Sequence, residues 1–228
     1  VILPKKLLKS LRQRAKIRLS KMSNKKEELR FHKENFSTLC DLLSKKDRHF
    51  KAIIKQHGYP PMWTRPNTFQ TLILTILEQQ VSLASAYAAF KKLKQKVGFV
   101  TPGKILMLSD EELRACYFSR QKIIYARELA NAIKNKQLNL RKLSVSDEIT
   151  IRTELKKIKG IGDWTVDVYL MHALQRTDLF PLGDIALVNS LKDVKQLPHT
   201  ITKEKMLEIA ESWRPYRTIA SMILWHAY

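Results

Sequence analysis

A single carboxylate, Asp184, stands in a sequence context that could support catalysis. It follows Pro181 and Gly183, and it directly precedes an apolar helical pattern that begins at Ile185. An aspartate at such a place is most often a helix N-cap, because its carboxylate accepts hydrogen bonds from the free amides of the first turn. A catalytic role is compatible with capping, since an acid that is held by helix amides stays ionised at neutral pH. Taken alone, the residue is best interpreted as a cap.

A short segment with two glycines lies upstream of this aspartate and could bind an anion. Gly160, Ile161 and Gly162 separate two helical patterns. The glycines permit a tight turn, and the amides at the start of the second helix would point outward at a phosphate. Lysines at 156, 157 and 159 add positive charge. By itself the pattern favours an ordinary helix–turn–helix corner with a glycine at the cap.

The charge of the chain indicates an anionic polymer as its partner. Forty-two Lys and Arg residues against 21 Asp and Glu residues give a net charge of +21 and a pI near 10.0. Eleven cations and two anions within Val1 to Arg30 account for +9 of this charge, which leaves +12 for the rest of the chain. A solvated basic surface without a partner is the alternative. The charge outside the N-terminal segment favours nucleic acid as the partner over this alternative.

The elements that must position these residues are predicted to be helices. Six glycines in 228 residues, few β-branched alternations and long runs of helix-forming residues predict an all-α fold. Helical spacing of apolar residues runs from Phe36 until the segment 57–61 breaks it, and a new helix follows Thr68. Ser109 and Glu112 have capping-box spacing. Because the connections are short, we expect two helical lobes around a cleft.

Cysteine usage and hydropathy indicate an intracellular protein. Cys40 and Cys116 lie far apart, which excludes a cysteine-based zinc or iron–sulfur cluster and disfavours a secreted disulfide framework. No apolar run approaches the roughly 20 residues of a membrane span, so no membrane partner is expected. The location would be the cytoplasm or nucleoid of a bacterium, or the nucleus of a eukaryote. Residues 1–34 form a basic extension that suits a surface helix, an arm along DNA phosphates or a targeting segment equally.

Four segments occur in a distinctive order along the chain. They are ILEQQVS at 76–82, KIKGIGDWT at 157–165, FPLGDIAL at 180–187 and ESWRPYRTIASMILW at 211–225, with 22 positions between Gly162 and Asp184. Over about 59–228 this set resembles the HhH-GPD (helix-hairpin-helix) superfamily of DNA glycosylases, and within it the alkylbase, or 3-methyladenine DNA glycosylase II, branch. The resemblance implies a glycosylase domain over 35–228, with a middle lobe at about 67–175 and a second lobe built from the N- and C-terminal helices.

The resemblance also implies the chemistry of the site. Asp184 would be the catalytic residue, which faces a flipped nucleotide, stabilises the oxocarbenium-like sugar and orients or deprotonates the attacking water. Superfamily members that also cleave the strand carry a lysine nucleophile two positions after the second hairpin glycine. This chain has Trp164 there. The resemblance therefore implies a monofunctional enzyme that needs no cofactor and leaves an abasic site.

Aromatic residues are expected to form a pocket for the base. Trp164 and Trp225 match pocket aromatics of the family, although core packing explains Trp225 nearly as well. Alkyl-purine members often have an aromatic residue where this chain has Val168, and Tyr169 stands next to it as a further pocket candidate. Such a pocket favours cationic, alkylated purines through cation–π attraction of about 0.5–2 kcal/mol per contact. The substitution at Val168 predicts a wider pocket or a different lesion preference.

Further residues are candidates for contact with DNA. The predicted contacts are the hairpin residues Lys159, Gly160, Ile161, Gly162 and Thr165, the minor-groove residues Gln79 and Gln80, and Ser119 and Lys122 of a family SxxK element. A polar helix end explains the glutamines equally well, and an ordinary capped turn explains Ser119. No metal is required, although the carbonyls of 158–162 could hold a monovalent cation. His172 and His226 have no paired acids or cysteines nearby, so satisfied or solvated histidines are expected there.

These inferences predict a monofunctional DNA N-glycosylase of base excision repair that acts as a monomer on double-stranded DNA with damaged bases. It would flip out alkylated purines such as 3-methyladenine and hydrolyse their N-glycosidic bond. One alternative is a non-catalytic helix-hairpin-helix module that only binds DNA, and another is a glycosylase for a different damaged base. A bifunctional glycosylase and lyase is disfavoured by Trp164.

Overall fold

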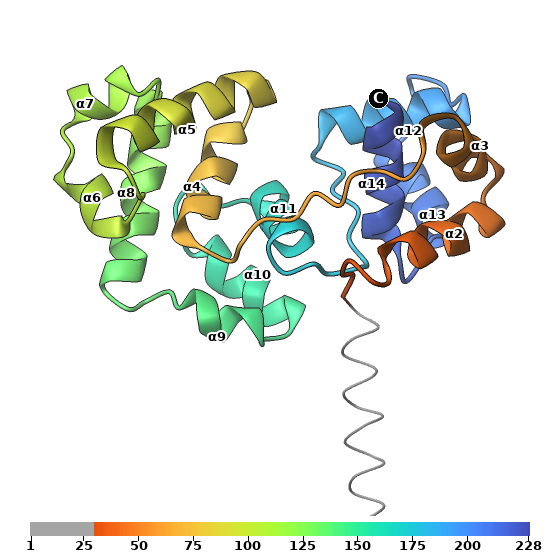
Figure 1. The fold of residues 1–228 in the computed structure, drawn as a ribbon, viewed down its shortest axis with the longest axis horizontal. Coiled ribbons are helices and arrows are strands. Elements are labelled where there is room, and N and C mark those ends of the chain that lie inside the picture. The colour runs from red at the N-terminus through yellow and green to blue at the C-terminus, as the bar shows by residue number, and fades with distance from the viewer. Residues whose placement is uncertain (1–29) are drawn as a thin grey trace, which may run out of the picture.

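The computed structural model describes residues 30–228, and this part of the chain is helical, with a single isolated β-bridge between Arg30 and Arg176. The predicted all-α fold is confirmed. Two groups of helices stand side by side (Figure 1). One group consists of α4 (Phe69–Glu78), α5 (Leu83–Val97), α6 (Pro102–Met107), α7 (Asp110–Ala115), α8 (Arg120–Lys134), α9 (Leu140–Ser144), α10 (Glu148–Lys156) and α11 (Asp163–His172). The other consists of α2 (Phe36–Lys46), α3 (Arg48–His57), α12 (Ile185–Lys195), α13 (Lys203–Glu211) and α14 (Arg217–Ala227).

Side-chain caps determine where many of these helices begin. Thr68 accepts a hydrogen bond from the amide of Thr71 at the start of α4. Ser109 and Glu112 form a reciprocal capping box at the start of α7, as their spacing predicts. Each such cap satisfies an amide that has no partner within the helix, and its loss typically costs about 1 kcal/mol.

Each lobe has its own hydrophobic core. The first core is built from residues between Phe69 and Leu179, and the second from residues 31–53 together with residues 180–224. The chain passes between the lobes in the linker from α3 to α4, drawn in orange, and again after α11 (Figure 1). Trp225 of α14 packs against both cores, so this side chain joins the two lobes.

The N-terminal part of the fold differs from the sequence-based expectation in two ways. The helical pattern from Phe36 to His57 is two helices rather than one, because Asp47 leaves the helical conformation and caps α3 by accepting from the amide of His49. The folded body also begins before residue 35, since Phe31 is fully buried. The predicted boundary at 34 is therefore too late, and the rest of the basic extension, residues 1–29, lies outside the described residues.

A search of the described helices for a membrane span found none of sufficient length and apolarity.

Candidate active site

A cleft of about 1510 Å³ opens between the two lobes. Residues 162–165, Val168 and His172, which belong to α11 and the turn before it, line the cleft on the side of the first lobe. Residues 183–186 and Trp225 line it on the side of the second lobe. In Figure 1 α11 is the helix of the first group that faces α12 and α14. The fold thus brings Trp164, Asp184 and Trp225 to one cavity.

The carboxylate of Asp184 is held by three N–H donors. It caps α12, with Oδ1 accepting from the amide of Leu187 at 2.9 Å. Oδ1 also accepts from Nε1 of Trp225 at 3.1 Å, and Oδ2 accepts from Nε1 of Trp164 at 3.1 Å. The cap and the cleft-facing acid are therefore the same residue. All three of these partners are N–H donors, which suits a negatively charged carboxylate.

Gly183, which precedes Asp184, lies against Trp164. A Cβ on Gly183 would lie 3.4 Å from the Cβ of Trp164, so the two chain segments are in close contact at this point. Trp164 stands in the first turn of α11, and Asp184 stands directly before α12. The hairpin and Asp184 lie far apart in sequence, but the hydrogen bond from Trp164 to Asp184 joins the start of α11 to the start of α12.

Aromatic rings form the walls of the cleft around Trp225. The imidazole of His172 stacks on Trp225 with ring centroids 5.9 Å apart, and Trp63 meets Trp225 edge-on at 6.4 Å. Tyr87 and Tyr228 also line the cavity. The sequence did not indicate Trp63, because the neighbouring prolines marked its segment only as a break between helices.

Tyr169 does not belong to this cleft, and its assignment as a pocket residue is corrected. Its side chain is fully buried in the first core, and its hydroxyl donates to Oδ1 of Asn67 at 2.7 Å. Val168, one position earlier, is the residue that lines the cavity. On a helix, successive residues point about 100° apart, and here this step turns Tyr169 away from the cavity and into the first core.

The hairpin between α10 and α11 presents exposed backbone to solvent. Gly160 adopts a φ of +92°, and a Cβ there would lie 2.0 Å from the ring of Tyr125. The first amides of α11 have no partner within the helix, as in any helix, and no side chain caps them. Lys159 is exposed, whereas Ile161 is buried. An uncapped helix start beside an exposed lysine is suited to binding a phosphate.

One of the residues predicted to contact DNA, Gln79, binds to the hairpin itself. Gln79 donates through Nε2 to the carbonyl oxygen of Gly160 at 2.8 Å and to Oγ1 of Thr165 at 3.0 Å. Thr165 is buried, so it supports the hairpin from within. The neighbouring Gln80 is exposed and has a φ of +57°, which places it at the tip of the loop with Val81. Of the two glutamines, Gln80 is the one that is free to enter a groove.

The carbonyls of the hairpin are partly occupied by protein donors. Ile158 accepts from the amide of Ile161 at 3.0 Å, and Gly160 accepts from Gln79. The monovalent cation site stays a prediction. Within residues 30–228, no group of three His, Cys, Asp or Glu side chains is arranged to hold a metal ion.

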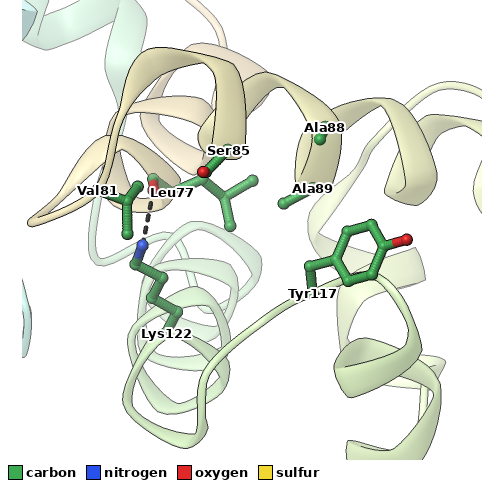
Figure 2. A pocket seen from close by; sticks show the side chains of 7 residues that line it. All are labelled: Leu77, Val81, Ser85, Ala88, Ala89, Tyr117 and Lys122. Carbon is green, nitrogen blue, oxygen red and sulfur yellow. Dashed lines mark hydrogen bonds between the residues drawn. The ribbon is translucent and has the colours of Figure 1, made fainter.

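Ser119 and Lys122 lie at the start of α8, and Lys122 lines a smaller hollow of about 280 Å³ (Figure 2). The hydroxyl of Ser119 accepts from the amide of Lys122, so Ser119 is an N-cap. The ammonium of Lys122 donates to the carbonyl oxygen of Leu77 at 2.7 Å, as Figure 2 shows. Burial lowers the pKa of Lys122. The lysine stabilises the C-terminal end of α4, so its predicted contact with DNA would require it to leave this carbonyl.

A buried ion pair closes the cleft on the side of α4. Arg65 of the linker binds both carboxylate oxygens of Glu78, with Nη–Oε distances of 2.8 and 2.6 Å. Both residues line the cavity, and Glu78 is buried. Hydrogen bonding to this carboxylate raises the pKa of Arg65 in spite of its burial. The pair fixes the linker that carries Trp63 against α4.

Comparison with known proteins finds a similarity to DNA repair proteins over most of this chain. The family model described as HhH-GPD superfamily base excision DNA repair protein matches residues 73–215. DNA-3-methyladenine glycosylase 1 of Schizosaccharomyces pombe is 32% identical over 80% of this chain and 83% of its own length. YfjP of Bacillus subtilis is 33% identical over 77% of this chain, which spans 64% of that protein.

A solved structure shows the same arrangement of helices. Schizosaccharomyces pombe 3-methyladenine DNA glycosylase Mag1, in complex with abasic DNA, superposes with a TM-score of 0.76 and 30% identity. The match covers 82% of this chain and 95% of that one.

Proposed function

Because this chain belongs to the HhH-GPD superfamily of base excision DNA repair proteins, we propose that it is a monofunctional DNA N-glycosylase for alkylated purines such as 3-methyladenine. Its partner is DNA. The relatives that are named as 3-methyladenine glycosylases support the choice of substrate. The observation that carries the proposal is the carboxylate of Asp184, held by three N–H groups on the wall of an aromatic cleft.

Binding would begin at the hairpin and the loop after α4. The free amides of α11 and the ammonium of Lys159 would hold a phosphate of the damaged strand. Gln80 and Val81, which are exposed at the tip of the neighbouring loop, would fill the space that the displaced nucleotide leaves in the duplex. Extruding the nucleotide costs a few kcal/mol, less for a damaged base that pairs poorly.

The base would then enter the cleft among Trp63, Trp164 and Trp225. A purine that is alkylated at N3 or N7 carries a positive charge, which aromatic faces attract. The bond between C1′ and the base nitrogen breaks, and its electron pair neutralises the departing base. The carboxylate of Asp184 stabilises the cationic sugar and accepts a proton from the water that adds to C1′. The products are the free base and an abasic site.

Trp164 supports the monofunctional assignment. A lyase needs an amine that attacks C1′ and forms a Schiff base. At the position where strand-cleaving members carry that amine, this chain has an indole whose N–H binds Asp184. We further propose that the enzyme acts as a monomer on double-stranded DNA, in the cytoplasm or nucleoid of a bacterium or in the nucleus of a eukaryote.

The test is release of base from methylated duplex DNA, with mild alkali converting abasic sites into strand breaks. Asp184→Asn should lower the single-turnover rate roughly a hundredfold or more, because the neutral amide cannot stabilise the sugar cation. Asp147→Asn is the matched control, since this exposed aspartate caps α10 as Asp184 caps α12 but does not line the cleft. Wild-type rates in Asp184→Asn would assign the chemistry to another catalytic residue, and absence of base release by the wild-type protein would leave a DNA-binding module. A borohydride-trapped adduct would contradict the monofunctional assignment.

A further inference from the structure

His172 lines the cleft but has no part in the chemistry described so far. It is the last residue of α11 and stands two turns beyond Trp164, with Val168 between them. Residues at this spacing share one face of a helix, and all three line the cleft. The side chain is largely enclosed, with only 9% of the residue exposed.

Two contacts hold the imidazole in one orientation, and a backbone hydrogen bond fixes the residue that carries it. Its Nδ1 lies 2.6 Å from the carbonyl oxygen of Trp63. Its ring stacks on Trp225 at an interplanar angle of 22°, and its own carbonyl oxygen accepts from the amide of Arg65 at 2.8 Å. The ring is therefore fixed on both sides, by the linker and by the second lobe.

The bond to Trp63 determines which nitrogen carries the proton. A carbonyl oxygen can only accept, so Nδ1 must donate. Burial lowers the pKa of His172 to about 4, and the nearby Arg65 acts in the same direction, so the ring is neutral at physiological pH. In a neutral ring with hydrogen on Nδ1, Nε2 carries a lone pair and is an acceptor.

Nε2 is left for a ligand. None of the residues 30–228 donates a hydrogen bond to it, and it is not among the fully enclosed polar atoms that lack a partner. An acceptor that lies next to the aromatic walls of the cleft recognises an N–H group. Adenine offers such a group at its exocyclic amine, and so does guanine at N1 and its own amine.

We propose that Nε2 of His172 accepts a hydrogen bond from an N–H group of the purine that enters the cleft, so that this histidine selects alkylated purines that present an N–H donor at this point. The inference rests on the proposed glycosylase function. A base that presents only carbonyl oxygen or ring nitrogen at this point would face a lone pair and would be disfavoured. His172 is thus a specificity-determining residue, distinct from the acid that acts on the sugar.

Two substitutions test the roles of Nδ1 and Nε2 of His172 separately. His172→Asn retains a short amide that can donate to Trp63 in place of Nδ1, but it ends before the position of Nε2. His172→Gln is one methylene longer and can place its amide oxygen near Nε2. Tyr169→Phe is the matched control, because it removes a buried hydrogen bond from the same helix without changing the cleft.

The measurements are single-turnover release of 3-methyladenine from methylated duplex and the affinity for a duplex with a tetrahydrofuran abasic-site analogue. We expect His172→Asn to be about tenfold slower than wild type, which is about 1.4 kcal/mol, and His172→Gln to recover most of this rate. Tyr169→Phe should stay within about twofold. All variants should bind the abasic-site duplex like wild type, because that ligand has no base to contact Nε2.

Equal rates in His172→Asn and wild type would overturn the inference, and so would equal losses in the Asn and Gln variants. A parallel loss of affinity for the abasic-site duplex would also overturn it, since the histidine would then be supporting the fold. Absence of base release by the wild-type protein would instead overturn the proposed function itself.

Discussion

The donors that bind Asp184 come from three helices and from both lobes. Leu187 belongs to α12, Trp164 to α11 and Trp225 to α14. One donor is the backbone amide that any N-cap would use, whereas the two indoles come from distant parts of the sequence. The bond from Trp164 therefore forms only while the two lobes are packed together.

Replacing either indole of this set should reduce catalysis more than it reduces stability. Trp164→Phe and Trp225→Phe each keep an aromatic ring and remove one N–H bond to a charged carboxylate. Such bonds contribute about 1.5–3 kcal/mol, so we expect single-turnover base release to fall roughly tenfold to a hundredfold.

Trp63→Phe is the control for these two variants, because Trp63 lines the same cleft without a hydrogen bond to Asp184. Its rate should stay within a few-fold of wild type. A loss as large as that of Trp164→Phe would mean that the shape of the cleft, rather than the N–H bonds, sets the rate.

For single residues, the sequence identifies a place in the site only where the neighbouring residues along the chain form a distinctive motif. Asp184 after Pro181 and Gly183, and Trp164 after the hairpin, are of this kind. Trp63 and His172 are not, because their place in the cleft depends on how the linker crosses the lobes and on which face of α11 is turned outward. Tyr169 was misassigned for the same reason, since the sequence alone does not say which of two adjacent side chains points into a cavity.

The hairpin is the element whose backbone conformation is most restrictive. Gly160 combines a positive φ with close contact to the ring of Tyr125. We expect Gly160→Ala to lower the free energy of unfolding by about 2–4 kcal/mol, because the new Cβ both strains the backbone and overlaps the ring. Urea denaturation measures this loss.

Gly162→Ala provides the comparison within the same turn. Its φ is −100°, and a Cβ there would meet no atom within 4 Å. Its stability should stay within about 0.5 kcal/mol of wild type. If the two alanine variants were equally stable, the restriction at Gly160 would be absent and the turn would be more adaptable than its geometry indicates.

Helix starts were predictable because local chemistry sets them. Thr68 and Ser109 cap their helices through bonds that lie within four residues. The break at Asp47 was not predictable, because it is stabilised from far along the chain. Trp213 donates to Oδ2 of Asp47 at 3.0 Å, and Lys195 pairs with the same oxygen. The helical spacing of apolar residues continues through Asp47, so it did not indicate that the first helix ends there.

The charge of the whole molecule is divided between the described body and the N-terminal segment. Residues 1–29 contain ten cations and two anions, which is +8 of the +21, so residues 30–228 retain +13. Arg30 belongs to the body, because its guanidinium donates to the carbonyl oxygen of Ser144 and its own carbonyl accepts from Asn35. A truncation that tests the segment should therefore begin at Arg30.

Removing residues 1–29 should weaken DNA binding and make it less dependent on salt, while base release at saturating enzyme stays within about twofold of the full chain. Each phosphate contact that is lost lowers the magnitude of the negative slope of log K against log salt concentration by roughly 0.9, because fewer counterions are released on binding. Fluorescence anisotropy across a salt series measures the slope. The residual charge of +13 should keep the magnitude of the slope clearly above zero. An unchanged slope would show that the segment does not meet phosphates, and loss of base release by a folded truncation would place part of the active site in residues 1–29.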